Sequence, residues 1–141
     1  MGTRQWTKEQ LAAITARNKT LLVSAGAGSG KTATLTERII RMLLDRTAPV
    51  SLSDLLIVTF TNAAAGELRD RIGAALKAAM AEHPEDSRLA EEFLTLPGAP
   101  IYTIDAFCNE VLRMNTDSIG LPPDYRITDA AEANHVASSV M

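Results

Sequence analysis

One stretch of the sequence decides the fold: Ser24-Ala25-Gly26-Ala27-Gly28-Ser29-Gly30-Lys31-Thr32. It follows a short apolar run at 20–24, which we expect to be a strand, and it precedes an amphipathic segment. A strand, a glycine-rich loop and a helix in this order are the context of a phosphate-binding loop. Glycines let consecutive backbone N–H groups turn toward anionic oxygens, and the positive end of the following helix faces the same place. The stretch therefore predicts a site for a nucleotide triphosphate.

Each residue type in this loop has an expected role. The ammonium of Lys31 would bind the β- and γ-phosphates, and the hydroxyl of Thr32 would ligate Mg²⁺. We predict these two as the catalytic residues, with Thr32 as the metal ligand. The residues predicted to bind ATP in this loop are Ala25, Gly26, Ala27, Gly28, Ser29, Gly30, Lys31 and Thr32.

The loop has one departure from the general pattern, because Ala25 occupies its first glycine position. A small residue suffices there if its φ is negative. The alternative is a glycine-rich turn that ends in Gly-Lys-Thr by chance. A dinucleotide fold is not indicated, since the glycine spacing is not G-x-G-x-x-G and a Lys-Thr pair follows directly.

Composition limits the class of protein. The 141 residues fit one domain, or one domain with the beginning of a second, and 46% hydrophobic residues suffice for a core. The net charge of −3 gives no overall basic surface, so any nucleic-acid contact is expected to be local. The single cysteine, Cys108, is expected to be a small buried apolar residue in a reducing cytoplasm. No apolar run has the length of a membrane span.

Hydrophobic periodicity predicts alternating helices and strands. After a first helix beginning near Thr7, the predicted order is helix 31–46, strand 55–60, a long helix capped by Thr61-Asn62, helix 89–96, strand 100–104 and a further helix. The long helix is expected to have Leu68, Ile72, Leu76 and Met80 on one face, and the last helix to have Phe107, Val111 and Leu112 facing inward. This alternation favours an α/β fold with a parallel sheet flanked by helices. The pattern breaks near 118–123, and Asp129 is expected to cap an Ala-rich helix. We therefore predict a first domain at 1–117 and the beginning of a second at 118–141.

Gln10 has two interpretations. Thr7 and Gln10 have the spacing of a capping box, in which each side chain bonds the other residue's backbone N–H. Alternatively, the Gln10 amide reads the N6/N7 edge of adenine, a pairing available to Asn and Gln side chains.

Polar residues follow two further predicted strands, and the carboxyl ends of parallel strands are where ligands bind in open α/β sheets. Thr59, Thr61 and Asn62 are candidates to hold a nucleic-acid phosphate, although Thr61 or Asn62 alone fits ordinary helix capping. Thr103 and Phe107 belong to the stretch 103–108 at the end of the later strand, and Phe107 either stacks on a base or belongs to the core.

Asp105 ends an apolar strand, as does the carboxylate behind Mg²⁺ in phosphate-loop proteins. Ala106 follows it where a catalytic Glu is expected. Either Asp105 is that carboxylate, or the acid lies after Met141. His83 and His135 have no metal-ligand spacing and are expected at the surface.

Three stretches in order resemble the opening motifs of superfamily 1 DNA helicases of the UvrD/Rep type: Trp6-Thr7-x-x-Gln10, 25–32 and Val58-Thr59-Phe60-Thr61-Asn62-Ala63. Two more, Thr103-Ile104-Asp105-Ala106-Phe107-Cys108 and 123–129, are similar to the A subunits of bacterial AddAB helicase–nucleases (AddA). The resemblance implies a P-loop NTPase (RecA-like) motor domain with ATP and Mg²⁺ as cofactors. It also implies that 118–141 opens an inserted helical subdomain.

The same resemblance implies roles. Gln10 would bind adenine, and single-stranded or double-stranded DNA would contact Thr59, Thr61, Asn62, Thr103, Asp105 and Phe107. In that family Asp105 is usually a His, and the Mg²⁺ carboxylate comes later in the chain. A whole enzyme would be a cytoplasmic ATP-dependent DNA helicase that acts in double-strand-break repair with an AddB-like partner. The 141 residues lack the later Asp-Glu motif, so we expect little hydrolysis from them alone.

Two other classes remain open from the sequence. One is a self-contained P-loop kinase or nucleotide switch that uses Asp105 for Mg²⁺. The other is a binding module whose loop holds another anion.

Overall fold

The computed structural model describes residues 5–26, 28–122, 124–128, 132 and 138. The chain forms two compact units, Met1–Ile104 and Asp105–Met141, and each is treated by itself below. The predicted domains, 1–117 and 118–141, are divided where the helix and strand pattern of the sequence breaks, and this division stays a prediction. No helix in the described part of the chain is long and apolar enough to cross a membrane.

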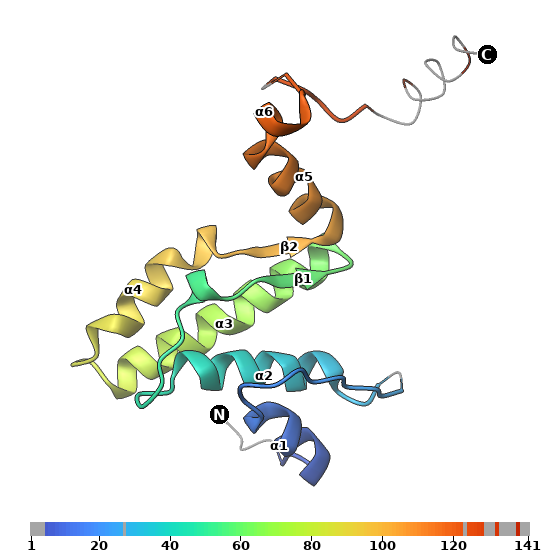
Figure 1. Ribbon diagram of the computed structural model, residues 1–141. Coiled ribbons are helices and arrows are strands. Elements are labelled where there is room, and N and C mark those ends of the chain that lie inside the picture. The colour runs from blue at the N-terminus through green and yellow to red at the C-terminus, as the bar shows by residue number, and fades with distance from the viewer. Residues whose placement is uncertain (1–4, 27, 123, 129–131, 133–137, 139–141) are drawn as a thin grey trace. The chain divides into compact units, whose positions relative to one another are not determined.

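The described residues of the first unit form four α-helices, two strands and two short 3₁₀ helices; Figure 1 labels the α-helices and the strands. The α-helices are α1 (Lys8–Thr15), α2 (Lys31–Leu43), α3 (Asn62–Glu82) and α4 (Ser87–Thr95), the strands are β1 (Ile57–Thr59) and β2 (Ile101–Thr103), and the 3₁₀ helices are η1 (Leu52–Asp54) and η2 (Leu96–Gly98). This order confirms the predicted alternation after Lys31, with shorter strands and with α2 ending three residues before Arg46.

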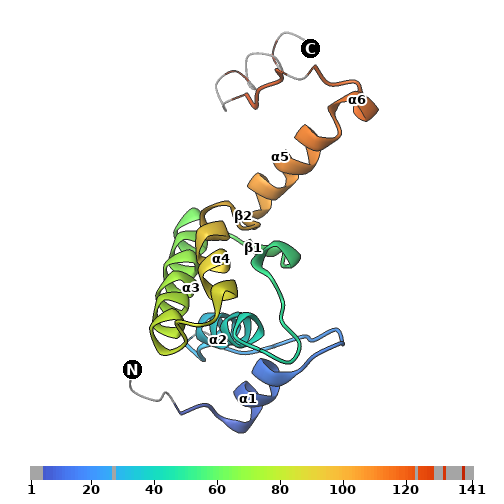
Figure 2. The same ribbon diagram turned by 90° about the vertical axis from the view of Figure 1, so that its left-hand side faces the viewer.

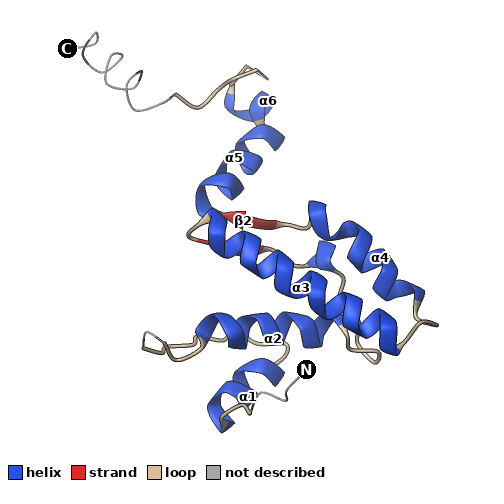
Figure 3. Ribbon diagram, turned by 180° about the vertical axis from the view of Figure 1, so that it is seen from behind, coloured by secondary structure: helices blue, strands red, loops and turns tan. Residues whose placement is uncertain are grey.

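The two strands are parallel, with Ile57 opposite Ile101 and Thr59 opposite Thr103. Helix α3 packs along one face of this pair, as Figure 3 shows from behind. Figure 2 shows α4 beside α3, and the two helices are in contact. A parallel pair needs a crossover between its strands, and α3 and α4 supply it here. The mixed α/β class with a helix-flanked parallel sheet is therefore confirmed at this level.

The strand predicted at 20–24 is wrong. These residues are exposed and have no ladder pairing, and Leu22 is 91% exposed. Among the described residues, β1 pairs only with β2. Apolar β-branched residues favour a strand only where a neighbouring strand accepts their backbone hydrogen bonds, and the described residues provide none beside 20–24.

The core of the first unit lies between α2, α3, α4 and the sheet. Helix α3 buries the face predicted from its spacing, with Leu68, Ile72 and Leu76 at 3% exposure or less. At Gly73, a Cβ would lie 3.1 Å from Leu96 Cδ2. Glycine therefore allows close packing of η2 on the helix, since a Cβ at this position would make Leu96 shift by a few tenths of an ångström.

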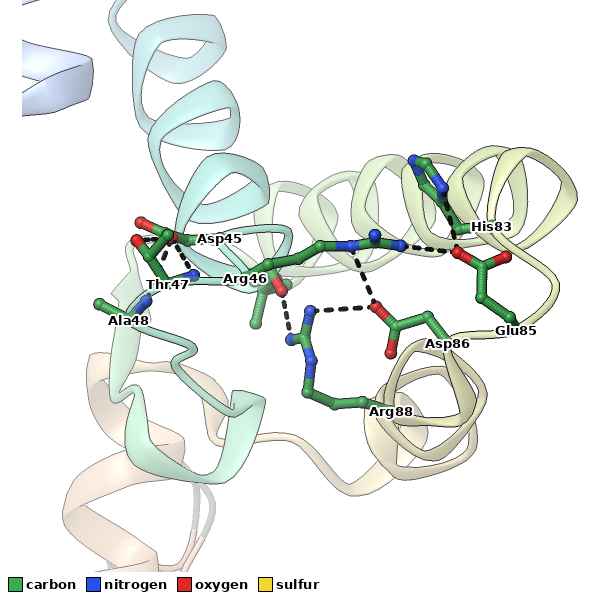
Figure 4. A network of polar contacts seen from close by, with 9 residues as sticks. Asp45, Arg46, Thr47, Ala48, His83, Glu85, Asp86 and Arg88 are labelled. Carbon is green, nitrogen blue, oxygen red and sulfur yellow. Dashed lines mark hydrogen bonds and ion pairs between the residues drawn. The ribbon is translucent and has the colours of Figure 1, made fainter.

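A polar network joins the ends of α2, α3 and α4 (Figure 4). Arg46 pairs with Glu85 at 3.1 Å and with Asp86 at 3.6 Å, and Arg88 donates to the carbonyl of Leu43 at 2.5 Å. His83 Nδ1 lies 3.6 Å from Glu85 Oε1, so this exposed residue belongs to the network. Most of these pairs are solvent-exposed, and such pairs contribute at most about 1 kcal/mol each. Their main effect is to hold the loop after α3 against the end of α2.

The second unit contains most of α5 (Ile104–Met114) and α6 (Thr116–Ile119). Tyr125 Oη donates to Asn109 Oδ1 at 2.8 Å, which ties the following segment to α5. The predicted inward face of α5 is wrong at Val111 and Leu112, which are 42% and 39% exposed, and Phe107 is half-buried.

Cys108 is also exposed rather than buried. An amphipathic pattern indicates which face seeks a partner, but burial needs that partner to be present. Asp129 and His135 lie outside the described residues.

Candidate functional site

The phosphate-binding loop takes the backbone conformations that its glycines allow. Gly28 and Gly30 have φ values of 75° and 82°, in the left-handed region that favours glycine. Gly30 is also the N-cap residue of α2, and among the described residues no side chain caps that helix end. The first N–H groups of α2 therefore face the loop without a side-chain acceptor, which is the arrangement that receives anions. Ala27 lies outside the described residues.

The ammonium of Lys31 lies against the carbonyl groups of this loop. Its Nζ donates to Ala25 O at 2.7 Å and to Gly26 O at 2.8 Å. Gly26 O also accepts from the Ser29 hydroxyl at 2.8 Å. The Lys31 cation is thus bound where negative oxygens gather, and phosphate oxygens would replace the carbonyl groups as its partners.

The capping box at α1 is confirmed. Thr7 Oγ1 accepts from the Gln10 backbone N–H at 3.2 Å, and Gln10 Oε1 accepts from the Thr7 backbone N–H at 3.0 Å. Gln10 Nε2 also donates to the carbonyl of Ser29 at 3.1 Å. This contact spans nineteen residues of sequence and places the amide beside the loop. The adenine contact of Gln10 stays a prediction, and its position beside the loop is consistent with it.

A cavity of about 300 Å³ lies between α1 and the loop. Its walls include the apolar side chains of Ala13 and Val23 and the polar groups of Thr7, Gln10, Ser24, Ser29 and Lys31. An amide at one part of the wall and an ammonium at another fit the two ends of a nucleotide, a base with hydrogen-bonding edges and an anionic phosphate chain. The residues present therefore fit the ATP predicted for this loop.

A second cavity, of about 610 Å³, brings the loop and the end of β1 together. It is lined by Lys31 and Thr32 as well as by Thr59 and Thr61. Four apolar residues also line it: Leu21 and Val23 before the loop, Leu35 on α2 and Phe60 after β1. The two predicted strand ends therefore share one cavity even though 20–24 is not a strand.

The same cavity includes a residue that the sequence pattern did not single out. Arg38 lines it and donates to the carbonyl of Ala13 at 2.7 Å. Partial burial, and secondarily the charge of Arg17, lower the pKa of the Arg38 guanidinium. Helical spacing is the sequence signal that could have identified Arg38 as a site residue, because it lies two turns after Lys31 on the same face of α2.

The capping interpretation of Thr61 is confirmed, since its Oγ1 accepts from the Ala64 N–H at 3.1 Å. The hydroxyl of Thr59 donates within the protein, 3.1 Å from Thr61 O and 3.3 Å from Tyr102 O. Asn62 is the first residue of α3 and is exposed. DNA contacts of these three residues stay predictions.

The remaining candidates are divided between the two units. Thr103 ends β2 in the first unit, whereas Asp105 is exposed in the first turn of α5 and Phe107 follows it in the second unit. Their DNA and Mg²⁺ roles are therefore predictions from sequence alone. Within the described part of the chain, no group of three or more His, Cys, Asp and Glu residues has the arrangement of a metal site.

Comparison with known proteins identifies the group to which this chain belongs. A family model described as "UvrD/REP helicase N-terminal domain" matches residues 6–141. Proteins named as the A subunit of an ATP-dependent helicase/nuclease are similar to the chain. That of Moorella thermoacetica is 52% identical over 140 residues, covering 99% of this chain and 10% of the relative. That of Desulforamulus reducens is 48% identical over 141 residues, covering all of this chain and 11% of the relative.

The chain thus spans about a tenth of the length of these curated relatives. The matched residues include the loop, the capping box and both strand ends described above. The resemblance to UvrD/Rep-type helicases is confirmed, and the chain belongs to the family of UvrD/REP helicase N-terminal domains.

Proposed function

We propose that this chain is the ATP-binding, N-terminal part of an AddA-like ATP-dependent DNA helicase/nuclease that acts in double-strand-break repair. The observation that carries the proposal is the position of Lys31, whose ammonium lies within the glycine loop while the Gln10 amide bonds to the same loop. Relatives at about half identity are named as helicase/nuclease subunits. The proposed fold is a RecA-like P-loop NTPase.

In this proposal the loop residues 25–30 bind the phosphates of ATP through their backbone N–H groups, and Lys31 neutralises the β- and γ-phosphates. Thr32 ligates Mg²⁺, which would neutralise charge on the phosphates when bound. Gln10 reads the adenine edge. Phosphate oxygens take the place of the Ala25 and Gly26 carbonyl groups at Lys31, so nucleotide binding exchanges its two bonds for stronger charge-paired ones.

DNA is proposed to bind at the ends of the two strands, through Thr59, Thr61 and Asn62. The support is the cavity of about 610 Å³, whose lining includes Thr59 and Thr61 together with Lys31 and Thr32. A ligand bound at one part of a cavity can change the affinity of another part for its own ligand. In this way ATP at the loop would alter the contact of Thr59 and Thr61 with DNA.

The whole protein is proposed to translocate along single-stranded DNA by ATP-driven domain closure, in the cytoplasm and with an AddB-like partner. The predicted contacts of Thr103, Asp105 and Phe107 belong to the same proposal.

The first test is nucleotide binding by this chain. Titration with a non-hydrolysable ATP analogue and Mg²⁺ should give saturable binding. Lys31→Ala should weaken it at least tenfold, because a charge-assisted contact with the phosphates is lost. Lys77→Ala, on α3, is the matched control, since it removes one positive charge away from both cavities described above.

The outcomes separate the candidate classes. Binding that Lys31→Ala leaves unchanged would refute the proposal. Equal protection of the fold by inorganic phosphate and by ATP would favour a general anion-binding module. Rapid turnover by the chain alone, without DNA and dependent on Asp105, would favour a self-contained kinase or switch. In the full-length protein, DNA-stimulated ATPase activity and unwinding should both be lost in Lys31→Ala.

A further inference from the structure

We infer that Arg69 is a positioning residue that holds the Thr103 end of β2 beside the start of α3, where DNA is proposed to bind. The inference rests on the proposed function, because Thr103 and the residues at the start of α3 are the proposed DNA contacts. It assigns a role to a side chain that is not expected to touch DNA itself and that acts through the main chain of β2.

Arg69 joins α3 to the outer edge of β2. Its Nη2 donates to the carbonyl of Ile101 at 2.5 Å. The preceding carbonyl, that of Pro100, accepts from the Ile57 N–H of β1 at 2.9 Å. Because successive carbonyl groups of a strand point to opposite sides, the Ile101 carbonyl faces away from β1. Among the described residues no strand lies on that side of β2, so Arg69 supplies the donor that a further strand would supply.

A second side chain holds β2 from its other side. The hydroxyl of Thr59 lies 3.3 Å from the carbonyl oxygen of Tyr102 and 3.1 Å from that of Thr61, and it donates between them. Two consecutive carbonyl groups of β2 are therefore bound, one by Arg69 and the other by Thr59. Thr59 ends β1 and Arg69 belongs to the helix that follows. One continuous segment thus contacts β2 on both sides just before Thr103.

Stability alone does not account for an arginine at this position. Arg69 Nε is buried and has no hydrogen-bond partner among the described residues. Replacing Arg69 with methionine would remove that unpaired N–H, but it would leave the carbonyl of Ile101, a residue that is 1% exposed, without its donor. Each form then has one buried polar group without a partner, and such groups carry similar costs. The arginine therefore fixes the place of β2 with little net effect on the free energy of unfolding.

The place of β2 is important because two proposed DNA-contacting segments meet there. Thr59 is opposite Thr103 in the parallel pair, and Thr61 and Asn62 begin α3. Phosphate contacts fix the register of a nucleic acid, so contacts from both segments require a fixed distance between them. Loss of the Arg69 contact should therefore weaken DNA binding. It should leave nucleotide binding unchanged, because Arg69 does not line the cavity of about 300 Å³ beside the loop.

The test compares Arg69→Met with Arg69→Lys and with Arg71→Met. Arg69→Met keeps the length of the side chain and removes its donors, whereas Arg69→Lys keeps a cation that can donate to the Ile101 carbonyl. Arg71→Met is the matched control, because Arg71 is exposed on the same helix and pairs with Glu67 at 2.6 Å. It removes the same charge and so accounts for a general loss of attraction for DNA.

Hydrogen exchange measures the hold on β2 without DNA. The Ile57 N–H bonds to the Pro100 carbonyl, so its exchange rate measures opening of the strand pair. In Arg69→Met it should exchange about tenfold faster or more, whereas the Leu44 N–H, bonded to Ile40 O in α2, should keep its rate. Tm should change by less than about 2 °C. Arg69→Lys should return at least half of the lost protection.

A contact that only stabilises the fold would give a different result. Arg69→Met would then lower Tm by several degrees, and the N–H groups of Ile57 and Leu44 would both exchange faster. If Arg69 had no hold on β2, the Ile57 exchange rate would be the same in Arg69→Met and in the unmodified chain. Either result would overturn the inference.

DNA binding measures the functional consequence. The Kd of this chain for a single-stranded dT oligonucleotide should rise about fivefold or more in Arg69→Met and less than about twofold in Arg71→Met. The Kd for a non-hydrolysable ATP analogue should change less than about twofold in both variants. Equal oligonucleotide Kd values for the two variants would refute the positioning role. If the unmodified chain binds no oligonucleotide, the proposed DNA contact fails instead, and the Ile57 exchange rate still decides whether Arg69 positions β2.

Discussion

Replacing Glu92 with alanine should destabilise the first unit more than any exposed substitution on α4. Glu92 is only 6% exposed, and its Oε2 accepts from the backbone N–H of Leu52 at 2.8 Å. Leu52 is itself 1% exposed, in the 3₁₀ helix η1 that leads into β1. The carboxylate therefore satisfies a buried donor in a segment that has few other links to α4.

The size of the destabilisation depends on the backbone N–H that the substitution leaves without an acceptor. In Glu92→Ala the Leu52 N–H stays buried without its acceptor, at a cost of about 1–3 kcal/mol, and the lost side-chain methylene packing adds about 1 kcal/mol. We expect a total of about 2–4 kcal/mol. Glu92→Gln keeps an acceptor oxygen of the same shape, so it should lose no more than about 1 kcal/mol as the bond becomes neutral.

The assay is thermal and urea unfolding of this chain. At about 4 °C per kcal/mol, Glu92→Ala should lower Tm by about 8–16 °C. Glu91→Ala is the matched control because Glu91 is the exposed neighbour on the same helix, and its effect should stay within about 0.5 kcal/mol. Equal losses for Glu91→Ala and Glu92→Ala would refute the argument, since they would show that the buried bond contributes no more than an exposed carboxylate.

Two further substitutions test local contacts. Thr61→Ala removes the cap of the α3 N–H at Ala64 and should lower stability by about 1 kcal/mol in urea unfolding, whereas Thr61→Ser should keep it. Asp45 accepts from the Thr47 hydroxyl and from the backbone N–H groups of Thr47 and Ala48, which lower the pKa of its carboxyl group. A lowered carboxyl pKa adds stability that is present above the unfolded pKa and lost as pH falls through the folded pKa. The urea midpoint should therefore fall less steeply below about pH 4 in Asp45→Asn than in the unmodified chain; identical pH profiles would contradict this.

The elements that were predicted correctly depend on contacts between residues close in sequence or on a regular spacing of hydrophobic residues. The start of α2 at Lys31 follows from Gly28 and Gly30, whose positive φ values do not belong to a helix, and from the amphipathic residues after them. The capping box at Thr7 involves residues three apart. The buried face of α3 follows from its Leu and Ile spacing over 21 residues. In each case the physical cause is contained in the segment itself.

The wrong predictions concern burial and pairing, which depend on distant partners. An apolar run at 20–24 becomes a strand only beside another strand, and among the described residues β1 pairs on one side with β2 alone. Leu21 and Val23 line the cavity of about 610 Å³ instead of a sheet. The exposed Val111 and Cys108 on α5 have the same explanation. The sequence pattern identifies an apolar face, and the pattern alone does not supply the atoms that cover it.

Gln10 shows how a local and a distant contact combine in one side chain. From sequence, capping and adenine binding are alternatives, because each interpretation accounts for a glutamine at this position. The contact of Gln10 Nε2 with Ser29, nineteen residues away, has no sequence signal, yet it brings the capping residue to the phosphate loop. Since an amide has four hydrogen-bonding positions and the cap uses only one of them, capping leaves the base contact possible. The two interpretations are therefore compatible, and the adenine contact of Gln10 stays a prediction.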